Sequence, residues 1–197
     1  MFFYFKRVFD LIIALLFFVL VLPLLFIASL SILIIDLQSP FFIQERSGLY
    51  GKKINIYKLK TMKFINGHKK VTNLGKILRL SKIDELPQLI NVLRNEMSII
   101  GPRPLYVDFN NYYKKNHKSR LSIKPGITGL AQIKVRDATD WYKKFNFDII
   151  YVKKISIKLD CYILFKTIII IINSLFSKKN RIIESYDYKK SFFENYL

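Results

Sequence analysis

Residues 81–105 read "SKIDELPQLINVLRNEMSIIGPRPL", and the rest of the fold can be placed around this stretch. Ser81, followed three positions later by Asp84, resembles a capping box in which Asp replaces the usual Glu or Gln. Pro87 is tolerated only in a first helical turn, and Gly101-Pro102 ends the regular structure. Apolar residues then recur at helical spacing, namely Leu86, Leu89, Ile90 and Leu93. The stretch predicts a helix that begins at or just after Asp84.

Two adjacent acids, Asp84 and Glu85, stand at this predicted helix start. In one interpretation Asp84 caps the helix and Glu85 is a solvated acid of the first turn. Neighbouring helix positions do not face each other, so the pair does not indicate general acid–base catalysis. In the other interpretation the helix N-terminus lowers the carboxylate pKa and attracts phosphate. An ionised Asp84 can then attack phosphorus to give an acyl phosphate. Spacing alone leaves both interpretations open.

Basic residues near the acids are candidates for phosphate binding. An anion that attacks a pyrophosphate needs charge neutralised nearby, by Mg²⁺, Arg or Lys. Arg103 lies between two prolines that restrict its backbone, and a guanidinium binds phosphate oxygens as a two-pronged fork. A stiff surface turn would explain the same three residues. Arg79 and Lys58 are weaker candidates, because the chain has 33 Lys and Arg residues that are mostly solvated.

An apolar run, residues 11–35, precedes this region and contains no charged residue. It exceeds the roughly 20 residues that cross a hydrocarbon core. Pro23, near its middle, bends a helix because it removes a backbone donor. Lys6 and Arg7 precede the run and a strongly basic chain follows it, so a plain span would place one basic end outside, against the positive-inside rule. A helix that returns to the same face avoids this, and both forms stay open.

The remaining segments alternate between short strands and helices. The expected elements are strands and turns over 36–63, a polar loop over 63–73, a helix over 74–80, a turn and strand over 122–135, and helical structure over 138–176. The chain therefore predicts a mixed α/β fold, helix-rich with short strands. Its expected divisions are a membrane helix (1–36), a globular domain with interfacial amphipathic helices (37–176) and a basic, aromatic tail (177–197).

The charge balance points to an anionic partner. The 33 basic and 14 acidic residues give a formal net charge of +19. This surplus suits a phosphate-bearing ligand, an acidic membrane surface or nucleic acid. No helix-turn-helix, RNA-recognition or zinc pattern accompanies it, so nucleic acid is not expected as a partner. A single Cys161 and two separated histidines argue against an internal disulfide and a structural zinc site.

Four pieces of the sequence together resemble one known family. They are "KRVFD" (6–10), "FFIQERSGLYGKKINIYKLKTM" (41–62), "LGKILRLSKIDELPQLINVLRNEMSIIGPRPL" (74–105) and "KPGITGLAQIKVR" (124–136). These pieces resemble the bacterial sugar-transferase family of small monotopic polyprenyl-phosphate phosphoglycosyl transferases. The match is most specific from Asp84 through Pro104. Scaffolds that recruit other glycan enzymes, and membrane-tethered nucleic-acid-binding proteins, are the alternatives.

The resemblance implies a reaction and a location. A sugar 1-phosphate would pass from a UDP-sugar, expected to be a UDP-N-acetylhexosamine derivative, to undecaprenyl phosphate, with release of UMP and with Mg²⁺ as cofactor. This is the first membrane step of surface-glycan or glycoprotein assembly. The domain would lie on the cytoplasmic face of the bacterial inner membrane, held by a re-entrant helix, with anionic lipids and downstream glycosyltransferases as further partners.

The resemblance also assigns site residues. Asp84 would be the nucleophile and a metal ligand, with Glu85 as its partner. Phosphate or other active-site contacts would come from Lys58, Arg79 and Arg103.

The resemblance also assigns two further positions, at which the sequence matches the family pattern less directly. Substrate binding would also involve Arg136 and a late acidic residue, Asp160, for which Asp148 is the alternative. Three departures from the family pattern bear on these assignments: Lys60 replaces an arginine, Val135-Arg136-Asp137 replaces Gly-Arg-Asn, and Leu22-Pro23 replaces Ser-Pro.

Overall fold

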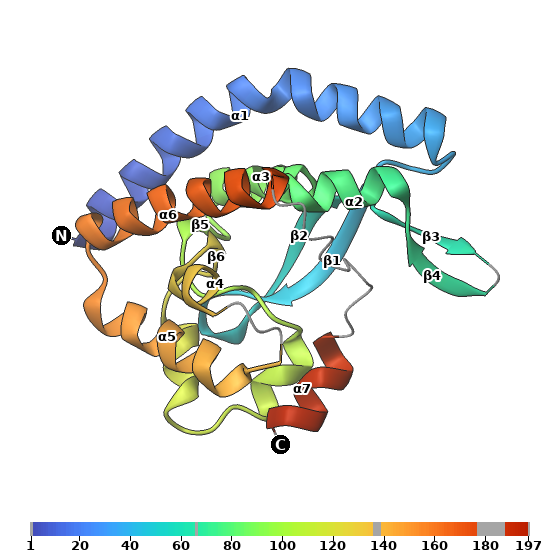
Figure 1. The fold of residues 1–197 in the computed structure, drawn as a ribbon. Coiled ribbons are helices and arrows are strands. Elements are labelled where there is room, and N and C mark those ends of the chain that lie inside the picture. The colour runs from blue at the N-terminus through green and yellow to red at the C-terminus, as the bar shows by residue number, and fades with distance from the viewer. Residues whose placement is uncertain (1, 66, 136–138, 177–187, 197) are drawn as a thin grey trace.

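A long apolar helix, α1 (Phe2–Ile35), arches over the rest of the molecule, with both of its ends turned toward the globular part (Figure 1). The computed structural model describes residues 2–65, 67–135, 139–176 and 188–196. α1 continues through Pro23, and the bend of the arch lies near its middle. Because proline lacks the N–H of an internal helical bond, a bend there is expected.

Three small pairs of strands form the sheet structure. β1 (Phe41–Ser47) and β2 (Lys53–Leu59) are antiparallel, with Phe41 opposite Leu59. β3 (Met62–Ile65) and β4 (His68–Val71) form a second hairpin. The polar loop predicted over 63–73 is therefore wrong in part: Gly67 supplies a φ of 78°, which closes a tight turn between two strands. β5 (Ser98–Ile100) and β6 (Gly126–Thr128) are parallel.

The helices around residues 81–105 differ from the expectation at their ends. α2 (Asn73–Leu80) is capped by Thr72, whose hydroxyl accepts from Gly75 N–H at 2.9 Å. Ser81 ends α2, and its hydroxyl donates to the Ile77 carbonyl. The capping box predicted from Ser81 is therefore wrong, since that hydroxyl serves the preceding helix. Regular helix resumes only at α3 (Leu89–Leu93).

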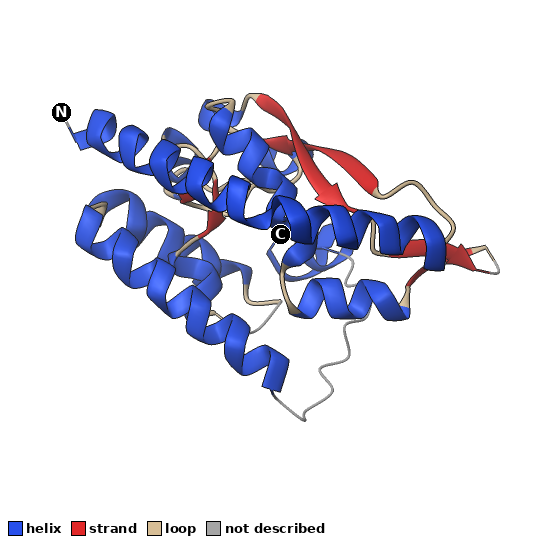
Figure 2. Ribbon diagram, turned by 90° about the horizontal axis from the view of Figure 1, so that it is seen from above, coloured by secondary structure: helices blue, strands red, loops and turns tan. Residues whose placement is uncertain are grey.

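The helical structure predicted over 138–176 is confirmed for 139–176, in two pieces, and helices that the sequence did not predict lie before and after it. The helices are α4 (Leu130–Lys134), α5 (Trp141–Lys154), α6 (Ile157–Phe176) and α7 (Tyr188–Tyr196). The strand expected within 122–135 is limited to β6. Seen from above, α1 and α6 lie near each other at the start of each helix and separate toward their ends (Figure 2).

Three apolar clusters hold the described elements together, and the smallest packs Ala28 and Ile32 of α1 against Leu59 and Leu78. Two are larger. One unites α1, α3, β5 and α6 through buried residues that include Ala14, Val92, Ile100 and Ile163. The other is aromatic and joins α5 to α7 through Trp141, Phe145, Phe192 and Tyr196. The fold class predicted from the sequence, helix-rich mixed α/β with short strands, is thus confirmed.

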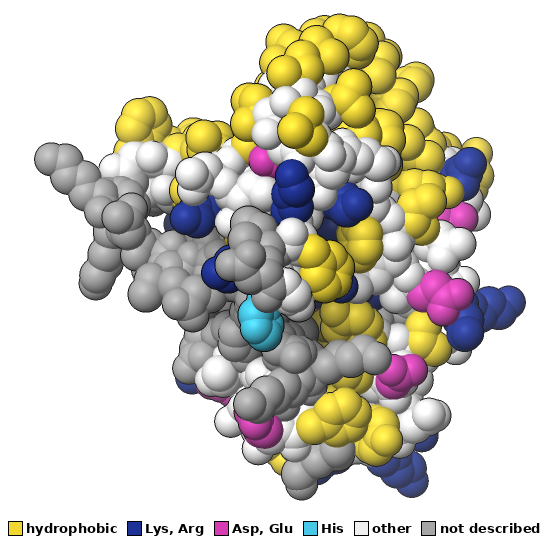
Figure 3. All heavy atoms as spheres, turned by 90° about the vertical axis from the view of Figure 1, so that its right-hand side faces the viewer, with side chains coloured by type: hydrophobic (Ala, Val, Ile, Leu, Met, Phe, Trp, Pro, Cys, Tyr) yellow, Lys and Arg dark blue, Asp and Glu magenta, His cyan; other side chains and the backbone are white. Residues whose placement is uncertain are grey.

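A large apolar surface remains uncovered. Side chains of α1 such as Leu20 and Phe26 are about two-thirds exposed, and α6 exposes Phe165 and Phe176. Figure 3 shows apolar side chains crowded over the part formed by α1, with basic side chains below them. By length and composition, α1 and α6 could each cross a membrane. Such a surface suits contact with lipid.

Candidate active site

The two acids follow a reversal of the chain at Lys82. This residue adopts a left-handed backbone conformation with a φ of 61° directly after α2. The chain then enters a tight 3₁₀ turn, Ile83–Gln88, which packs against β2. Asp84 and Glu85 lie in its first turn, and both are buried. The reversal therefore brings two adjacent carboxylates inside the protein.

Glu85 is surrounded by cations. Its Oε1 accepts from Arg103 Nη2 at 2.9 Å and from Lys58 Nζ at 3.4 Å, and Lys82 Nζ lies 4.0 Å from Oε2. Burial alone would raise the pKa of Glu85, but the charges of Arg103, Lys82 and Lys58 hold that pKa well below its usual range. Glu85 is therefore ionised and fixes the positions of Arg103 and Lys58.

Asp84 is placed very differently. Its Oδ1 is buried and has no hydrogen-bond partner among the residues that the structure describes. Burial, followed by the negative charge of Glu85, raises the pKa of Asp84 from 3.8 to about 6. The lowered pKa expected for a helix N-terminus is therefore wrong, because a short 3₁₀ turn offsets little of the desolvation. The carboxylate still ionises near neutral pH and has an oxygen without a partner.

The loop that carries Arg103 is held from behind. The Arg103 carbonyl accepts from Arg120 Nη2 at 2.7 Å, and Arg120 Nε is paired with Asp148 at 3.0 Å. Arg120 and Asp148 are both buried. Sequence reasoning considered Asp148 only as an alternative to Asp160 and passed over Arg120, since nothing in the sequence distinguishes it from the other basic residues. This ion pair supports the loop and thereby helps to orient Arg103.

Lys58, on β2, and Arg79, on α2, both precede the acids in the chain and act electrostatically on Asp84. Burial lowers the pKa of Lys58, against the opposing effect of Glu85. Arg79, in the last turn of α2, donates from Nε to Thr61 Oγ1 at 2.9 Å, and its charge acts on Asp84. The structure thus brings together five of the predicted residues: Lys58, Arg79, Asp84, Glu85 and Arg103.

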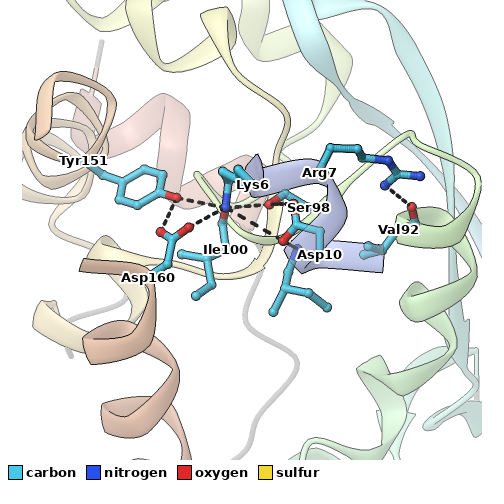
Figure 4. Close-up of polar contacts among 9 residues, drawn as sticks. Lys6, Arg7, Asp10, Val92, Ser98, Ile100, Tyr151 and Asp160 are labelled. Carbon is cyan, nitrogen blue, oxygen red and sulfur yellow. Dashed lines mark hydrogen bonds and ion pairs between the residues drawn. The ribbon is translucent and has the colours of Figure 1, made fainter. Parts of the chain in front are cut away.

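Asp160 does not join them. Its two oxygens bind Lys6 Nζ at 2.6 Å and Tyr151 OH at 2.7 Å, in a buried network that also includes Asp10 (Figure 4). Asp160 is buried and does not line the cavity beside Glu85, and its role in substrate binding stays a prediction. In the structure it ties the start of α6 to the start of α1. Arg136 lies outside the described residues.

A cavity of about 410 Å³ lies beside Glu85 and Arg103, whereas Asp84, Lys58 and Arg79 are not among its lining residues. Its polar lining includes Lys82, Glu85, Arg103, Gln132, Lys144 and Asp148. Its apolar lining includes Ile13 and Phe17 of α1 and Leu164, Ile168 and Ile171 of α6. One cavity therefore connects the charged residues to the two helices that expose apolar surface, which suits a ligand with a charged head and an apolar tail.

Asp84 is the described residue best suited to hold a magnesium ion. Among the described residues no group of three or more His, Cys, Asp or Glu side chains could hold a metal. Mg²⁺ in phosphate-transfer sites is commonly held by one or two carboxylates together with substrate phosphates. Asp84, with its unpartnered Oδ1, fits this pattern, whereas the oxygens of Glu85 already face three cations.

Comparison with known proteins identifies the family of this chain. The family model described as "Bacterial sugar transferase" matches residues 1–174. An uncharacterized sugar transferase, EpsL of Bacillus subtilis, is 39% identical over 172 residues, which cover 83% of this chain and 85% of that protein. A UDP-glucose:undecaprenyl-phosphate glucose-1-phosphate transferase of Klebsiella pneumoniae is 36% identical over 182 residues, covering 83% of this chain and 39% of that protein.

The name of a third relative specifies a different sugar. The UDP-N-acetylgalactosamine-undecaprenyl-phosphate N-acetylgalactosaminephosphotransferase of Aeromonas hydrophila is 38% identical over 154 residues, covering 68% of this chain and 36% of that protein. The chain thus spans well under half the length of the Klebsiella and Aeromonas relatives and most of EpsL. On the family match and these identities, the chain belongs to the bacterial sugar transferase family.

Proposed function

We propose that this protein transfers a sugar 1-phosphate from a UDP-sugar to undecaprenyl phosphate, with release of UMP. The observation that carries the proposal is the pair of buried acids, in which Glu85 is held by Arg103 and Lys58 while Asp84 keeps an oxygen without a partner. Relatives named as undecaprenyl-phosphate sugar-phosphate transferases support the same reaction. The donor expected from the sequence is a UDP-N-acetylhexosamine derivative, whereas the names of relatives include both glucose and N-acetylgalactosamine donors.

The proposed chemistry has two steps at Asp84. In the first, a carboxylate oxygen of Asp84 attacks the phosphorus that carries the sugar, and the bond from that phosphorus to UMP breaks. The product is an aspartyl phosphosugar, an acyl phosphate. In the second step, an oxygen of the lipid phosphate attacks the same phosphorus and the bond to Asp84 breaks. Asp84 is regenerated as a carboxylate, and the lipid diphosphate sugar is formed.

Positive charge around the acids serves both steps. Arg103 donates to Glu85 in the structure, and a guanidinium suits the oxygens of a diphosphate. Lys58 lies on the other side of Glu85. Asp84, aided by donor phosphates, would hold Mg²⁺, which neutralises charge on the diphosphate. In this assignment Glu85 is a positioning residue for the two cations.

The membrane arrangement proposed here is re-entrant. The start of α1 is bound to α6 through Lys6 and Asp160. Its other end packs Ile32 against the cluster that contains Leu59 and Leu78, and Asp36 accepts from Thr72 at 2.7 Å. Because both ends contact one globular part, the exposed middle of α1 would dip into one leaflet. We place the globular part on the cytoplasmic face, where basic residues meet anionic lipid.

The direct test is UMP release by the purified full-length protein with undecaprenyl phosphate, Mg²⁺ and a panel of UDP-sugars. The two-step scheme predicts UMP and a mass increase of one phosphosugar on Asp84 when the lipid acceptor is omitted, detected by intact-protein mass spectrometry. UMP release that strictly requires the acceptor, with no adduct, would favour direct transfer. No UMP release with any donor would favour a scaffold role instead.

A further inference from the structure

Gln132 has a buried side-chain amide without a hydrogen-bond partner among the described residues. It lies in α4 and lines the cavity that also contains Glu85 and Arg103. Its Oε1 and Nε2 atoms are both buried and have no hydrogen-bond partner in the part of the chain that the structure describes. A buried amide without partners destabilises the folded chain, so its presence in a cavity needs an explanation. A bound group that satisfies both atoms would supply one.

The position of Gln132 is fixed relative to the Arg103 loop. Gly101 N–H donates to the Thr128 carbonyl at 2.9 Å, just before α4. At Gly129 a Cβ atom would lie 2.1 Å from the Gly101 carbonyl oxygen and 2.8 Å from Gln132 Oε1. Only glycine allows this close approach of backbones. The start of α4 is therefore held against the loop that leads into Arg103, and the amide side chain folds over the same junction.

We propose that Gln132 binds the sugar of the nucleotide-sugar donor, an inference that rests on the transferase activity proposed above. The amide presents a donor and an acceptor side by side. A phosphate oxygen would satisfy Nε2 but would place negative charge against Oε1. A hydroxyl or acetamido group of a sugar can satisfy both atoms. A site built to hydrogen-bond one such group discriminates against sugars that lack it.

A uracil ring also carries adjacent donors and acceptors, but the residues that line the cavity favour the sugar. The cavity that Gln132 lines continues to Ile13 and Phe17 of α1 and to Ile168 of α6, which belong to the apolar helices. In the proposed reaction the sugar phosphate ends on the lipid, whereas UMP leaves for water. The group that moves toward the membrane is therefore the one expected in this cavity.

The experiment compares full-length wild-type protein with Gln132→Met, which keeps the length but removes both polar atoms, and Gln132→Glu, which keeps an acceptor and loses the donor. Gln44→Met is the matched control, because Gln44 lies on β1 outside the cavity lining and its amide already bonds Arg46 and Tyr106. UMP release is measured with UDP-glucose, UDP-galactose and their N-acetylated counterparts. Product inhibition by UMP and the thermal unfolding midpoint without substrate are measured for each variant.

We expect Gln132→Met to lower kcat/KM about 10- to 100-fold for the best donor and much less for the poorest, so that the preference among sugars shrinks. UMP inhibition should stay within about twofold of wild type, and the unfolding midpoint should not fall, because the change removes unpaired polar atoms. Gln44→Met should keep the donor ranking.

Three results would overturn the inference. An equal loss for all donors with a lowered unfolding midpoint would make Gln132 structural. Weakened UMP inhibition with an unchanged donor ranking would assign the amide to uracil. Wild-type kinetics in both Gln132 variants would show that the amide binds no part of the donor. If the wild-type protein releases no UMP from any donor, the proposed function fails, which is a separate outcome.

Discussion

Burial of Asp84 opposes the ionisation that its proposed role as a nucleophile requires. Burial and the adjacent Glu85 raise the pKa of Asp84 to about 6, so the carboxylate is ionised at neutral pH only at a cost in folding free energy. Glu85 escapes this cost because Arg103, Lys58 and Lys82 surround it. The two pKa values shift in opposite directions because Glu85, rather than Asp84, forms the ion pairs with these cations.

We expect Asp84→Asn to abolish activity and to stabilise the protein at neutral pH. With a folded pKa above its unfolded value, Asp84 contributes most stability below about pH 4 and loses that contribution as the pH rises through about 6. The stability difference between Asp84→Asn and wild type should therefore grow over this range, to about 3 kcal/mol at most. Thermal unfolding from pH 4 to 8, without Mg²⁺, measures it. A pH-independent difference would contradict the raised pKa.

Arg103 can be separated from the general surplus of positive charge. A guanidinium fork on a phosphate is geometrically specific, so Arg103→Lys should be nearly as damaging as Arg103→Ala. Each should lower kcat/KM by about 30- to 1000-fold, or about 2–4 kcal/mol in transition-state stabilisation. UMP release is measured in detergent, where the charge of the leaflet no longer matters. Lys53→Ala, at an exposed residue that pairs with the exposed Glu45, is the control and should match wild type. If Arg103→Lys regains wild-type UMP release in detergent, Arg103 acts only as a membrane-facing charge and does not bind phosphate.

At the scale of elements, α7 supports a wall of the cavity from outside. Phe192 stacks on Phe109 at 3.8 Å between ring centroids and also packs edge-on against Trp141. Ser191 accepts from Trp141 Nε1 at 3.1 Å. Trp141 itself lines the cavity. α7 lies beyond residues 1–174 that match the family model, so this support is an addition to the matched region.

Phe192→Ala should therefore destabilise the protein by about 3–5 kcal/mol, as expected when a fully buried aromatic side chain is removed. Its neighbour Phe193, which is 40% exposed, provides a matched control. Phe193→Ala should cost much less, because less of its surface is withdrawn from water. Thermal or denaturant unfolding in detergent gives the comparison. Equal effects of the two changes would mean that α7 does not dock through Phe192.

At the scale of the whole molecule, the proposed re-entrant membrane topology rests on the arch of α1. Both ends of α1 contact the globular part, and Figure 1 shows the helix bent between them. Cysteines placed at Phe2 and Glu45, in a Cys161→Ser background, should both resist an impermeant thiol reagent in intact cells. Both should react after permeabilisation, which serves as the control. Labelling of position 2 alone in intact cells would indicate a plain span.

A companion change addresses the cause of the bend. Pro23→Ala restores the missing backbone donor and should straighten α1. We expect it to move part of the population to the spanning form, seen as partial labelling at position 2. An unchanged labelling pattern would show that the contacts at the two ends of α1 hold the arch without the proline.

The sequence by itself determined the features that depend on composition and local pattern. The uncharged run of residues 11–35 predicted a long apolar helix, which the structure contains. The role of the acids and of the proline-flanked Arg103 in chemistry on phosphate stays a prediction. Alternating strand and helix patterns were enough for the fold class. Each of these depends on residues close together in the chain, which is why a local reading succeeds.

Only the tertiary structure decided which partner each side chain meets. It paired Asp160 with Lys6 and placed Arg120 and Asp148 behind the Arg103 loop. It also reversed the expected direction of the Asp84 pKa shift. These outcomes depend on burial and on contacts between residues far apart in sequence. Desolvation and charge pairing act through space, so no spacing along the chain could specify them.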